Sequence, residues 1–430
     1  MRHSQSFSIQ NLPTLKSQLL QWAQQFDEVV WLDSNSYPHK TIGNYEAVLA
    51  VDAFTVLKTD TNKAFEQLNE YQQLTKDWIF GYLTYDLKND VEDLQSNNID
   101  QLNFPCLYFF QPKKIIRITN NAIIFDYLRM VDDEIETDYL EIIDEVLFEE
   151  ATAIETPKIR MRLTKDQYKE KVSQVKKHIA LGDVYEANFC QEFFAENAVI
   201  NPLTTYKALN TISKPPMASF LKIEDKYALC ASPERYIKKQ GNQLISQPIK
   251  GTIKRATSEK EDKKLATELI QNPKERAENI MIVDLIRNDL SKTAVKGSVQ
   301  VTELCKVYSF KQVHQMISTV SSTLRKEYSP VDVIKTTFPM GSMTGAPKIS
   351  AMQIIEKLEV TKRGLYSGCI GYITPEGDFD FNVVIRSILY NQSQKYISFS
   401  VGGAITQNSE INAEYEECLL KAKAMREVLE

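Results

Sequence analysis

The sequence is poor in the residues that form disulfides and zinc sites. Only four histidines are present, and no CxxC pair occurs. The six cysteines are scattered along the chain as Cys106, Cys190, Cys230, Cys305, Cys369 and Cys418. Disulfide frameworks and zinc sites both need closer, patterned spacing. We therefore expect free thiols in a cytoplasmic protein, since cysteines stay reduced in that compartment.

Long apolar runs and a basic balance of charge are also lacking. No segment approaches 18 uninterrupted apolar residues, so we expect no membrane span. Residues 1–20 have no cationic stretch followed by a long apolar one, which argues against a secretory signal. The net charge of −6 argues against nucleic acid as the main partner, because phosphate binding favours a basic face.

The glycine-rich motifs of nucleotide-binding folds are absent. Neither GxGxxG nor GxxxxGK followed by Ser or Thr occurs, so no motif in the sequence supports a nucleotide-binding fold. What is present is ordinary for a globular protein: 430 residues, 43% of them hydrophobic and 25% charged. Such a chain can bury a sizeable core over one large domain or two to three smaller ones.

The pattern of residues 1–155 predicts mostly strands. Short apolar runs bounded by turns indicate strands at 28–33, 45–54 and 78–87. Residues 113–128 read as a hairpin turning at Asn120-Asn121. An acidic helical stretch follows at about 131–150, and residues 151–160 read as a connector.

The remainder of the chain mixes helices and strands. Thr164 and Gln167 form a capping-box pattern before a helical periodicity that Gly182 ends. We expect further strands at 184–194, 217–223, 226–232 and 395–403, and helices at 258–271, 273–288 and 411–430. Because the two kinds of element do not strictly alternate, the order favours an α+β fold over a doubly wound sheet.

Two pairs of glutamates share one spacing. Glu275 and Glu278, like Glu414 and Glu417, lie three residues apart on expected helices, so each pair projects from one helix face. Carboxylates without a nearby His or Cys suit a hard cation such as Mg²⁺. Such pairs are also common on solvated helix faces. The alternatives are an ion pair of Glu278 with Arg287 or another base, and one of Glu417 with Lys421.

Other candidates lie in turns and strand ends. Glu234 follows an apolar strand in Ser232-Pro-Glu-Arg-Tyr236, and Lys250 stands between a proline and a glycine in residues 247–252. Residues 341–348, GSMTGAPK, can point backbone N–H groups at an anion ahead of a helix, or form an ordinary capped turn. His314 has apolar neighbours, which suit a packed core histidine as well as a catalytic one.

Ten segments in a fixed order resemble the chorismate-binding enzymes. They are GDVYEANFCQ (182–191), SPERY (232–236), QPIKGT (247–252), ERAENIMIVDLIRND (275–289), VHQM (313–316), GSMTGAPK (341–348), YSGCIGY (366–372), FNVVIRS (381–387), VGGAI (401–405) and EYEECLLK (414–421). This resemblance implies two packed antiparallel-rich sheets with outer helices. It also implies a division of the chain into an N-terminal subdomain, residues 1–155, and a catalytic domain, residues 156–430. Residues 31–35, WLDSN, fall where relatives hold a tryptophan pocket.

The resemblance also assigns roles by position. Glu275, Glu278, Glu414 and Glu417 would hold Mg²⁺. Substrate-binding positions would be Thr252, Gly345, Tyr366, Arg386, Gly402, Gly403 and Lys421. The catalytic positions would be Lys250, Glu234, His314 and Glu186. In the chemistry implied, Lys250 attacks C2 of chorismate, Glu234 protonates the departing C4 hydroxyl, His314 lies near the ring, and ammonia adds at C4.

One residue separates the branches of this family. Anthranilate synthases typically have alanine where this chain has Lys250, and component I of aminodeoxychorismate synthases has lysine; Ser342 favours the same branch. The implied partner is a separate glutamine amidotransferase that supplies ammonia for 4-aminobenzoate and folate synthesis. Anthranilate synthase component I, or a non-catalytic homologue acting as a regulatory or scaffolding subunit, are the alternatives.

Position 186 departs from the family pattern. Many relatives with this chemistry have glutamine there, and the isochorismate and salicylate synthases have lysine, whereas this chain has Glu186. Without that lysine, activation of water at C2 is difficult to arrange. Glu186 either assists proton transfer or replaces glutamine as a hydrogen-bond acceptor.

Overall fold

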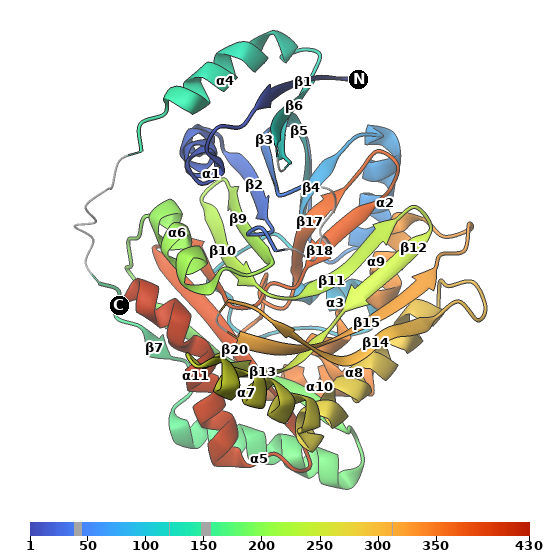
Figure 1. The fold of residues 1–430 in the computed structure, drawn as a ribbon. Helices are drawn as coiled ribbons and strands as arrows, with labels where there is room; N and C mark the ends of the chain where they lie inside the picture. Colours follow the sequence, from blue (N-terminus) through green and yellow to red (C-terminus); the bar gives the residue numbers. More distant parts are fainter. Residues whose placement is uncertain (38–44, 120, 148–155, 312) are drawn as a thin grey trace.

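A computed structural model describes residues 1–37, 45–119, 121–147, 156–311 and 313–430 (Figure 1). The N-terminal elements are β1 (Arg2–Ser8), α1 (Leu12–Trp22), β2 (Glu28–Asp33), β3 (Ala47–Thr59), α2 (Ala64–Thr75), β4 (Ile79–Leu83), α3 (Lys88–Val91), β5 (Leu107–Ile118), β6 (Ala122–Leu128) and α4 (Ile135–Asp144). The pairing of Ile118 with Ile123 confirms the predicted hairpin, while Asn120 and residues 148–155 of the expected helix and connector lie outside the described residues.

The second part of the chain starts with β7 (Arg160–Met161). It continues with α5 (Lys165–Leu181), β8 (Glu186–Ala195), α6 (Pro202–Ser213), β9 (Met217–Ile223), β10 (Lys226–Ser232), β11 (Arg235–Gln240), β12 (Gln243–Gln247), β13 (Ile249–Lys254), α7 (Glu259–Gln271) and α8 (Pro273–Ser291). The last elements are β14 (Gln300–Ser309), β15 (Val313–Thr323), α9 (Pro330–Thr337), β16 (Gly345–Ala346), α10 (Lys348–Leu358), β17 (Cys369–Ile373), β18 (Phe379–Asn382), β19 (Ser387–Asn391), β20 (Tyr396–Thr406) and α11 (Ile411–Leu429).

The strands form two antiparallel halves that meet at β5. One half runs β3-β2-β9-β10-β19-β20-β8, and β7 and β16 pair with β8. The other half runs β4-β17-β18-β11-β12-β15, with β13 and β14 also on β15. Strand β5 pairs with β3, with β4 and with β6. The mixed α+β fold with antiparallel-rich sheets is therefore confirmed.

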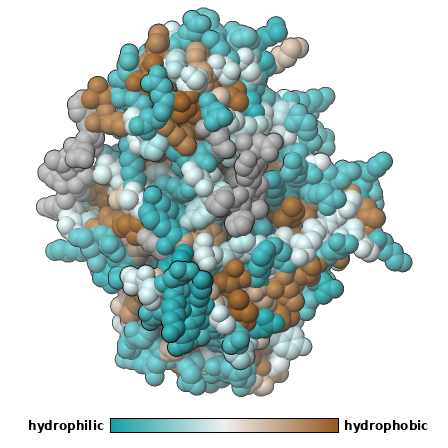
Figure 2. Space-filling view, in the orientation of Figure 1, coloured by the Kyte–Doolittle hydropathy of each residue, from teal (hydrophilic) through white to brown (hydrophobic). Residues whose placement is uncertain are grey.

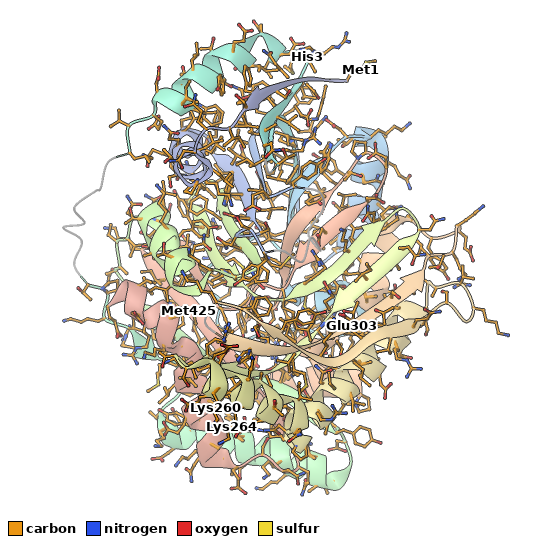
Figure 3. The ribbon with its side chains drawn as sticks, in the orientation of Figure 1. Met1, His3, Lys260, Lys264, Glu303 and Met425 are labelled. Carbon is orange, nitrogen blue, oxygen red and sulfur yellow. The ribbon has the colours of Figure 1, made fainter. Side chains whose placement is uncertain are left out.

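Alternation along β8 divides its side chains between two hydrophobic cores. Phe189 and Phe193 pack in an outer core beneath helices α1, α4, α5, α6, α10 and α11. Cys190 and Phe194 face the other way, into a core between the two halves that α8 and α9 also enter. Figure 3 shows side chains filling this interior. Every residue of Glu186–Ala195 is buried, so β8, predicted at 184–194, is covered on both faces.

Local signals set the ends of α5. The hydroxyl of Thr164 accepts from the backbone N–H of Gln167, and the Gln167 side chain accepts from the Thr164 N–H, so the predicted capping box forms. Gly182 ends the helix at φ 85°, a left-handed conformation that suits glycine. The chain then turns directly into β8, which carries one of the candidate residues, Glu186.

The N-terminal region shares hydrogen-bonded strands with the rest of the chain. Strand β2 pairs with β9, and β4 pairs with β17. The expected boundary between residues 155 and 156 adjoins a stretch outside the described residues, so a division there stays a prediction.

The cysteines and the length and hydropathy of the helices are as expected from the sequence. Figure 2 shows exposed hydrophobic side chains in small groups among hydrophilic ones. Among the described parts of the chain, no helix is both long and apolar enough to cross a membrane. All six cysteines are free thiols.

Candidate active site

Lys250 and Glu186 form an ion pair in the interior. The Nζ of Lys250, from β13, donates to Oε1 of Glu186 at the start of β8, at 3.2 Å. The Glu186 side chain is 1% exposed, and its Oε2 has no hydrogen-bond partner among the residues that the structure describes. Burial, the largest influence, lowers the pKa of Lys250, but Glu186, Glu278 and Glu234 together outweigh it, and the net pKa is raised.

Glu234 is the second buried carboxyl group beside Lys250. It lies in the turn between β10 and β11, and its own backbone N–H donates to the hydroxyl of Ser232. Burial raises the pKa of Glu234 to about 7, although Ser342, Lys250 and Arg386 each lower it. A carboxyl group with this pKa is substantially protonated at neutral pH, and it can therefore act as a proton donor.

Arg386 offers a guanidinium that is not used within the fold. It sits at φ 51°, between the strands β18 and β19. Among the described residues its guanidinium makes no hydrogen bond or ion pair, and Glu234 is the charged group that shifts its pKa. Burial lowers the pKa of Arg386, but a guanidinium stays charged in proteins, so a carboxylate placed there would gain a charge-assisted hydrogen bond. The hydroxyl of Tyr366 is also buried and lies 3.7 Å from the Sγ of Cys190.

The two glutamate pairs lie on helices α8 and α11, and two lysines form ion pairs with them. Lys274 Nζ lies 3.2 Å from Oε1 of Glu414 and 3.9 Å from Oε1 of Glu278. Glu417 instead pairs with Lys421 at 2.8 Å, as the alternative interpretation of its helix spacing predicted. Lys421 also donates to the carbonyl of Gly402 at 2.9 Å.

The acidic set carries negative charge that the protein only partly neutralises. Burial raises the pKa of Glu278 to about 7, and it also raises the pKa of Glu275, with a further contribution from Glu417. Oε1 of Glu278 is buried, and no group in the described part of the chain forms a hydrogen bond with it. No three acidic, His or Cys side chains of the described residues lie close enough together to share a metal ion as they stand. The donor set, all carboxylates with one unsatisfied oxygen, nonetheless fits a hard cation that replaces the lysine contacts.

Glycines allow the backbone to approach this set closely. A Cβ on Gly251, which has φ 88°, would lie 3.1 Å from Oε2 of Glu275, and one on Gly403 would lie 3.2 Å from Oε2 of Glu414. A Cβ on Gly345 would meet the carbonyl oxygen of Glu186 at 2.1 Å. Only glycine therefore lets the loop before α10 pair with β8 beside Lys250.

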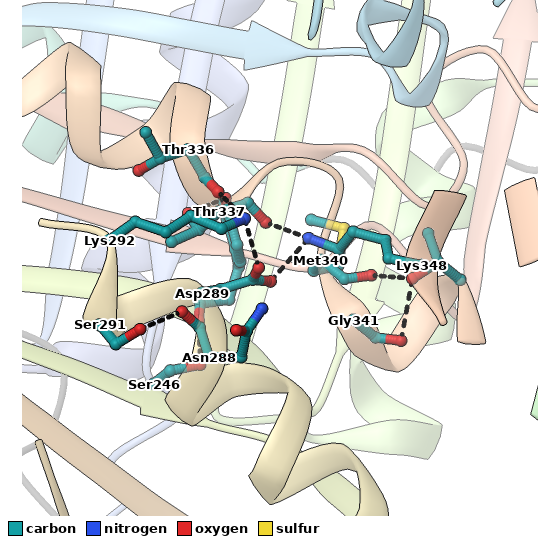
Figure 4. Close-up of polar contacts among 12 residues, drawn as sticks. Ser246, Asn288, Asp289, Ser291, Lys292, Thr336, Thr337, Met340, Gly341 and Lys348 are labelled. Carbon is teal, nitrogen blue, oxygen red and sulfur yellow. Dashed lines mark hydrogen bonds and ion pairs between the residues drawn. The ribbon is translucent and has the colours of Figure 1, made fainter. Parts of the chain in front are cut away.

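An ion pair between Lys348 and Asp289 holds the GSMTGAPK loop in place (Figure 4). Lys348, at the start of α10, lies 2.6 Å from Oδ2 of Asp289 near the end of α8 and donates to the carbonyl of Thr337. A small cavity lies beside this pair and extends to Glu234 and Ser342. The loop is therefore tied to the end of α8, beside the cavity that Glu234 lines.

His314 is engaged away from the other candidates. One ring nitrogen lies 3.0 Å from Oδ1 of Asp262, and the other lies 2.8 Å from the hydroxyl of Ser309. The residue is 2% exposed, as expected of a packed histidine. Its position near a reacting ring stays a prediction. Thr252 is exposed and pairs with Gln315 in the same strand ladder.

Some residues of this region were missed by the sequence interpretation. Lys274 joins the two acidic helices, although its position four residues before Glu278 was a signal for a contact. Arg287, the expected partner of Glu278, pairs with Asp284 instead at 2.7 Å. Buried Arg363 donates hydrogen bonds to the carbonyls of Met343 and Asn188. No local sequence pattern predicts these long-range hydrogen bonds.

The candidate site contains a possible nucleophile, a possible proton donor and a guanidinium that can bind an anion. Lys250, Glu186 and Glu234 converge from three distant segments, and Arg386 lies close enough to Glu234 to influence its pKa. The arrangement can transfer a proton to a leaving group while an amine attacks a small, carboxylate-bearing molecule.

Known proteins show the same combination of sequence and fold. The profile of a family described as chorismate binding enzyme matches residues 27–427. Aminodeoxychorismate synthase component 1 of Bacillus subtilis is 33% identical over 388 residues, covering 88% of this chain and 80% of that protein. The Escherichia coli protein of that name is 39% identical over 268 residues, covering 62% of this chain and 58% of its own length.

A solved structure extends the likeness to the fold. Anthranilate synthase component I of Streptococcus pneumoniae superimposes with a TM-score of 0.79 at 26% identity. The match covers 91% of this chain and 95% of that protein. The likeness therefore includes the N-terminal region as well as the segments that carry the candidate residues.

Proposed function

This chain belongs to the family of chorismate-binding enzymes, and from that premise we propose that it aminates chorismate at C4 to give 4-amino-4-deoxychorismate. The single observation that carries the proposal is Lys250 itself. It is a lysine with a 13% exposed side chain, whose amine lies beside Glu186 and within the electrostatic reach of Glu234 and Glu278. The resemblance of residues 247–252 to the lysine-bearing branch gives this residue its role.

The first half of the reaction uses Lys250 and Glu234. The neutral amine of Lys250 attacks C2 of chorismate, the two ring double bonds shift, and the C4–O bond breaks. Glu234, with a pKa of about 7, gives its proton to the departing hydroxyl, which leaves as water. Covalent catalysis of this kind replaces one difficult displacement by two easier ones.

The second half reverses the shift of the double bonds. Ammonia adds at C4, the C2–N bond breaks, and Lys250 leaves as the amine. Glu234 then takes a proton from the new C4 ammonium group and is ready for the next cycle. Arg386 and Tyr366 bind and orient the substrate, since arginine suits a carboxylate and the buried tyrosine is a neutral donor.

Magnesium fits the acidic set on α8 and α11. Glu275, Glu278, Glu414 and Glu417 would hold the ion, which supplies a positive charge for a substrate carboxylate. Lys274 and Lys421 occupy part of this set in the present arrangement. The family's use of chorismate makes a carboxylate the natural neighbour of such an ion.

We further propose that a separate glutamine amidotransferase supplies the ammonia. The product would then serve 4-aminobenzoate and folate synthesis in the cytoplasm, a compartment that suits six free thiols. The two proposed subdomains, residues 1–155 and 156–430, would form the synthase subunit of this pair.

The product of the purified protein tests the proposal. Chorismate, Mg²⁺ and an ammonium salt at alkaline pH should give 4-amino-4-deoxychorismate, identified by chromatography and mass and converted to 4-aminobenzoate by an added lyase. Anthranilate with pyruvate would assign the chain to the other branch. Absence of turnover, also with an added amidotransferase, would favour the non-catalytic homologue.

A further inference from the structure

Lys274 contacts carboxylates on both acidic helices. Its Nζ lies 3.2 Å from Oε1 of Glu414 on α11 and 3.9 Å from Oε1 of Glu278 on α8. These two glutamate side chains are 2% and 10% exposed, whereas the Lys274 side chain is 41% exposed. The amine therefore reaches buried carboxylates while much of the lysine side chain stays in solvent.

The position of Lys274 is unfavourable for its own helix. It follows Pro273 in the first turn of α8, and its backbone N–H donates to the side chain of Asn272. The N-terminus of a helix carries partial positive charge, which favours acidic over basic side chains in the first turn. The contacts with carboxylates therefore account for this lysine, and the local preference of α8 does not.

The lysine neutralises the acidic set only in part. Burial raises the pKa of Glu278 to about 7, and Lys250 and Lys274 both oppose this rise. Burial and the charge of Glu417 also raise the pKa of Glu275. The oxygen of Glu278 that lies nearest Lys274, Oε1, receives no hydrogen bond from the described residues. A divalent cation in this place would supply more charge than one ammonium group.

We propose that Lys274 is a tethered cation that holds α8 and α11 together without metal and moves into solvent when a divalent cation binds. This inference rests on the proposed function, because magnesium in the acidic set is part of it. With Lys274 between the helices, no three acidic, His or Cys side chains of the described residues are close enough to share an ion. The amine and the metal ion therefore compete for the same carboxylates.

The departure of Lys274 requires little rearrangement. Its amine makes its polar contacts with Glu414 and Glu278, and the backbone of the residue is held separately by Asn272. The partly exposed side chain can therefore leave without breaking other hydrogen bonds of the described residues. Its departure costs the ion pair with Glu414, so the lysine should lower the affinity for metal while it stabilises the metal-free protein.

Binding of Mn²⁺ to the wild type and to Lys274→Met tests the competition, followed by electron paramagnetic resonance without substrate. Methionine keeps most of the length of the side chain but has no charge. Removal of the competing amine should lower the Mn²⁺ dissociation constant about tenfold, within the usual range of coupling between two sites. Lys274→Arg keeps the charge and should bind Mn²⁺ no more tightly than the wild type.

Arg276→Met separates competition from a general loss of positive charge. Arg276 lies two residues further along α8, about 200° around the helix, and donates to the carbonyl of Ile270. Because salt screens a charge that does not contact the site, Mn²⁺ binding should stay within about twofold of the wild type. Equal tightening in Arg276→Met and Lys274→Met would show that only net charge matters, and would overturn the inference.

Urea unfolding gives a second measurement that does not depend on activity. Without metal, Lys274→Met should be less stable than the wild type, because buried Glu414 loses its cation. At saturating Mn²⁺ this deficit should shrink by about 1.4 kcal/mol, which is the tenfold change in affinity expressed as free energy. A lysine with only a structural role would cost the same stability with and without Mn²⁺, and that result would overturn the inference.

The remaining outcomes separate this inference from the proposed function. Weaker or unchanged Mn²⁺ binding by Lys274→Met would overturn the inference alone, since amination of chorismate by the wild type is assayed independently. A wild type that binds no Mn²⁺ refutes the magnesium site and the inference with it. If Lys274→Met does not fold, Lys274→Gln takes its place with the same expectation, because glutamine can still donate a hydrogen bond to Glu414 but carries no charge.

Discussion

At the scale of single residues, the site depends on a few buried charges that control one another. Lys250, Glu186 and Glu234 lie in different parts of the chain, and each shifts the pKa of a neighbour. The sequence predicted these three residues from short motifs. It could not predict that Oε2 of Glu186 has no partner, because that depends on the packing of β8 against a distant loop.

Glu234 should make the stability of the fold fall with pH. Its pKa is raised by burial from 4.5 to about 7, so the folded state holds a proton that the unfolded state loses. Stability is therefore highest below pH 4.5 and decreases until pH 7, by about 3 kcal/mol from this group. Glu234→Gln lacks this loss, so its free energy of unfolding, measured by urea titration, should exceed that of the wild type increasingly between pH 5 and 8.

The exposed helix residue Glu259 provides the control for this experiment. Its side chain is 81% exposed, and Glu259→Gln should differ from the wild type by the same small amount at every pH. A Glu234→Gln difference that does not grow with pH would contradict a raised pKa.

Arg386 should contribute to substrate affinity more than to folding. Its guanidinium has no hydrogen bond or ion pair within the described residues, so its removal breaks no internal contact. Loss of a charge-assisted hydrogen bond of about 1.5–3 kcal/mol predicts roughly 10- to 100-fold weaker chorismate binding in Arg386→Ala. Calorimetric titration measures this directly, and Arg386→Lys should recover only part of the loss. Unchanged affinity would exclude Arg386 from the substrate site.

At the scale of elements, Lys274 of α8 contacts Glu414 of α11, so the helices that carry the two glutamate pairs meet although 140 residues separate this contact in sequence. The i,i+3 spacing predicted each pair correctly as residues on one helix face. An ion pair of Glu278 with Arg287 or another base was suggested. Arg287 does not form it, because nine residues at about 100° each place it on the opposite side of α8. Lys274, four residues before Glu278, lies on the same face and makes the contact.

These two helices should bind a divalent cation. Mn²⁺ is a paramagnetic substitute for Mg²⁺, and its binding can be followed by electron paramagnetic resonance without any substrate. We expect Glu278→Gln to weaken Mn²⁺ binding by at least about tenfold, since even indirect contributors to metal sites have effects of that size. Glu416→Gln is the matched control, because Glu416 lies on α11 with a 64% exposed side chain paired to Lys165. Equal binding by all three proteins would contradict the metal site.

At the scale of the whole molecule, the N-terminal region and the rest of the chain are joined by backbone pairing. The predicted strands at 28–33 and 217–223 form correctly, yet their pairing with each other as β2 and β9 was not foreseen. Period-two alternation identifies a strand and its buried face, but it does not identify the neighbouring strand. The same limit applies to β4 and β17, which pair although nearly 300 residues separate them.

This pairing predicts that the chain unfolds as one unit. Unfolding residues 1–155 alone would leave β9 and β17 with unpaired edges and expose both cores. Tryptophan fluorescence reports only on the N-terminal region, since all three tryptophans, Trp22, Trp31 and Trp78, lie there. Far-ultraviolet circular dichroism reports on the whole chain. The two probes should give coincident urea transitions, and separate transitions would contradict the account.

The central claim is that Lys250 directs the amination of chorismate at C4. The most direct measurement is the product formed from chorismate and ¹⁵N-ammonium by the wild type and by Lys250→Ala, identified by mass spectrometry. The account predicts ¹⁵N-labelled 4-amino-4-deoxychorismate from the wild type and its loss in Lys250→Ala. Formation of the same C4-aminated product at an undiminished rate by Lys250→Ala, or of anthranilate by the wild type, would contradict the claim.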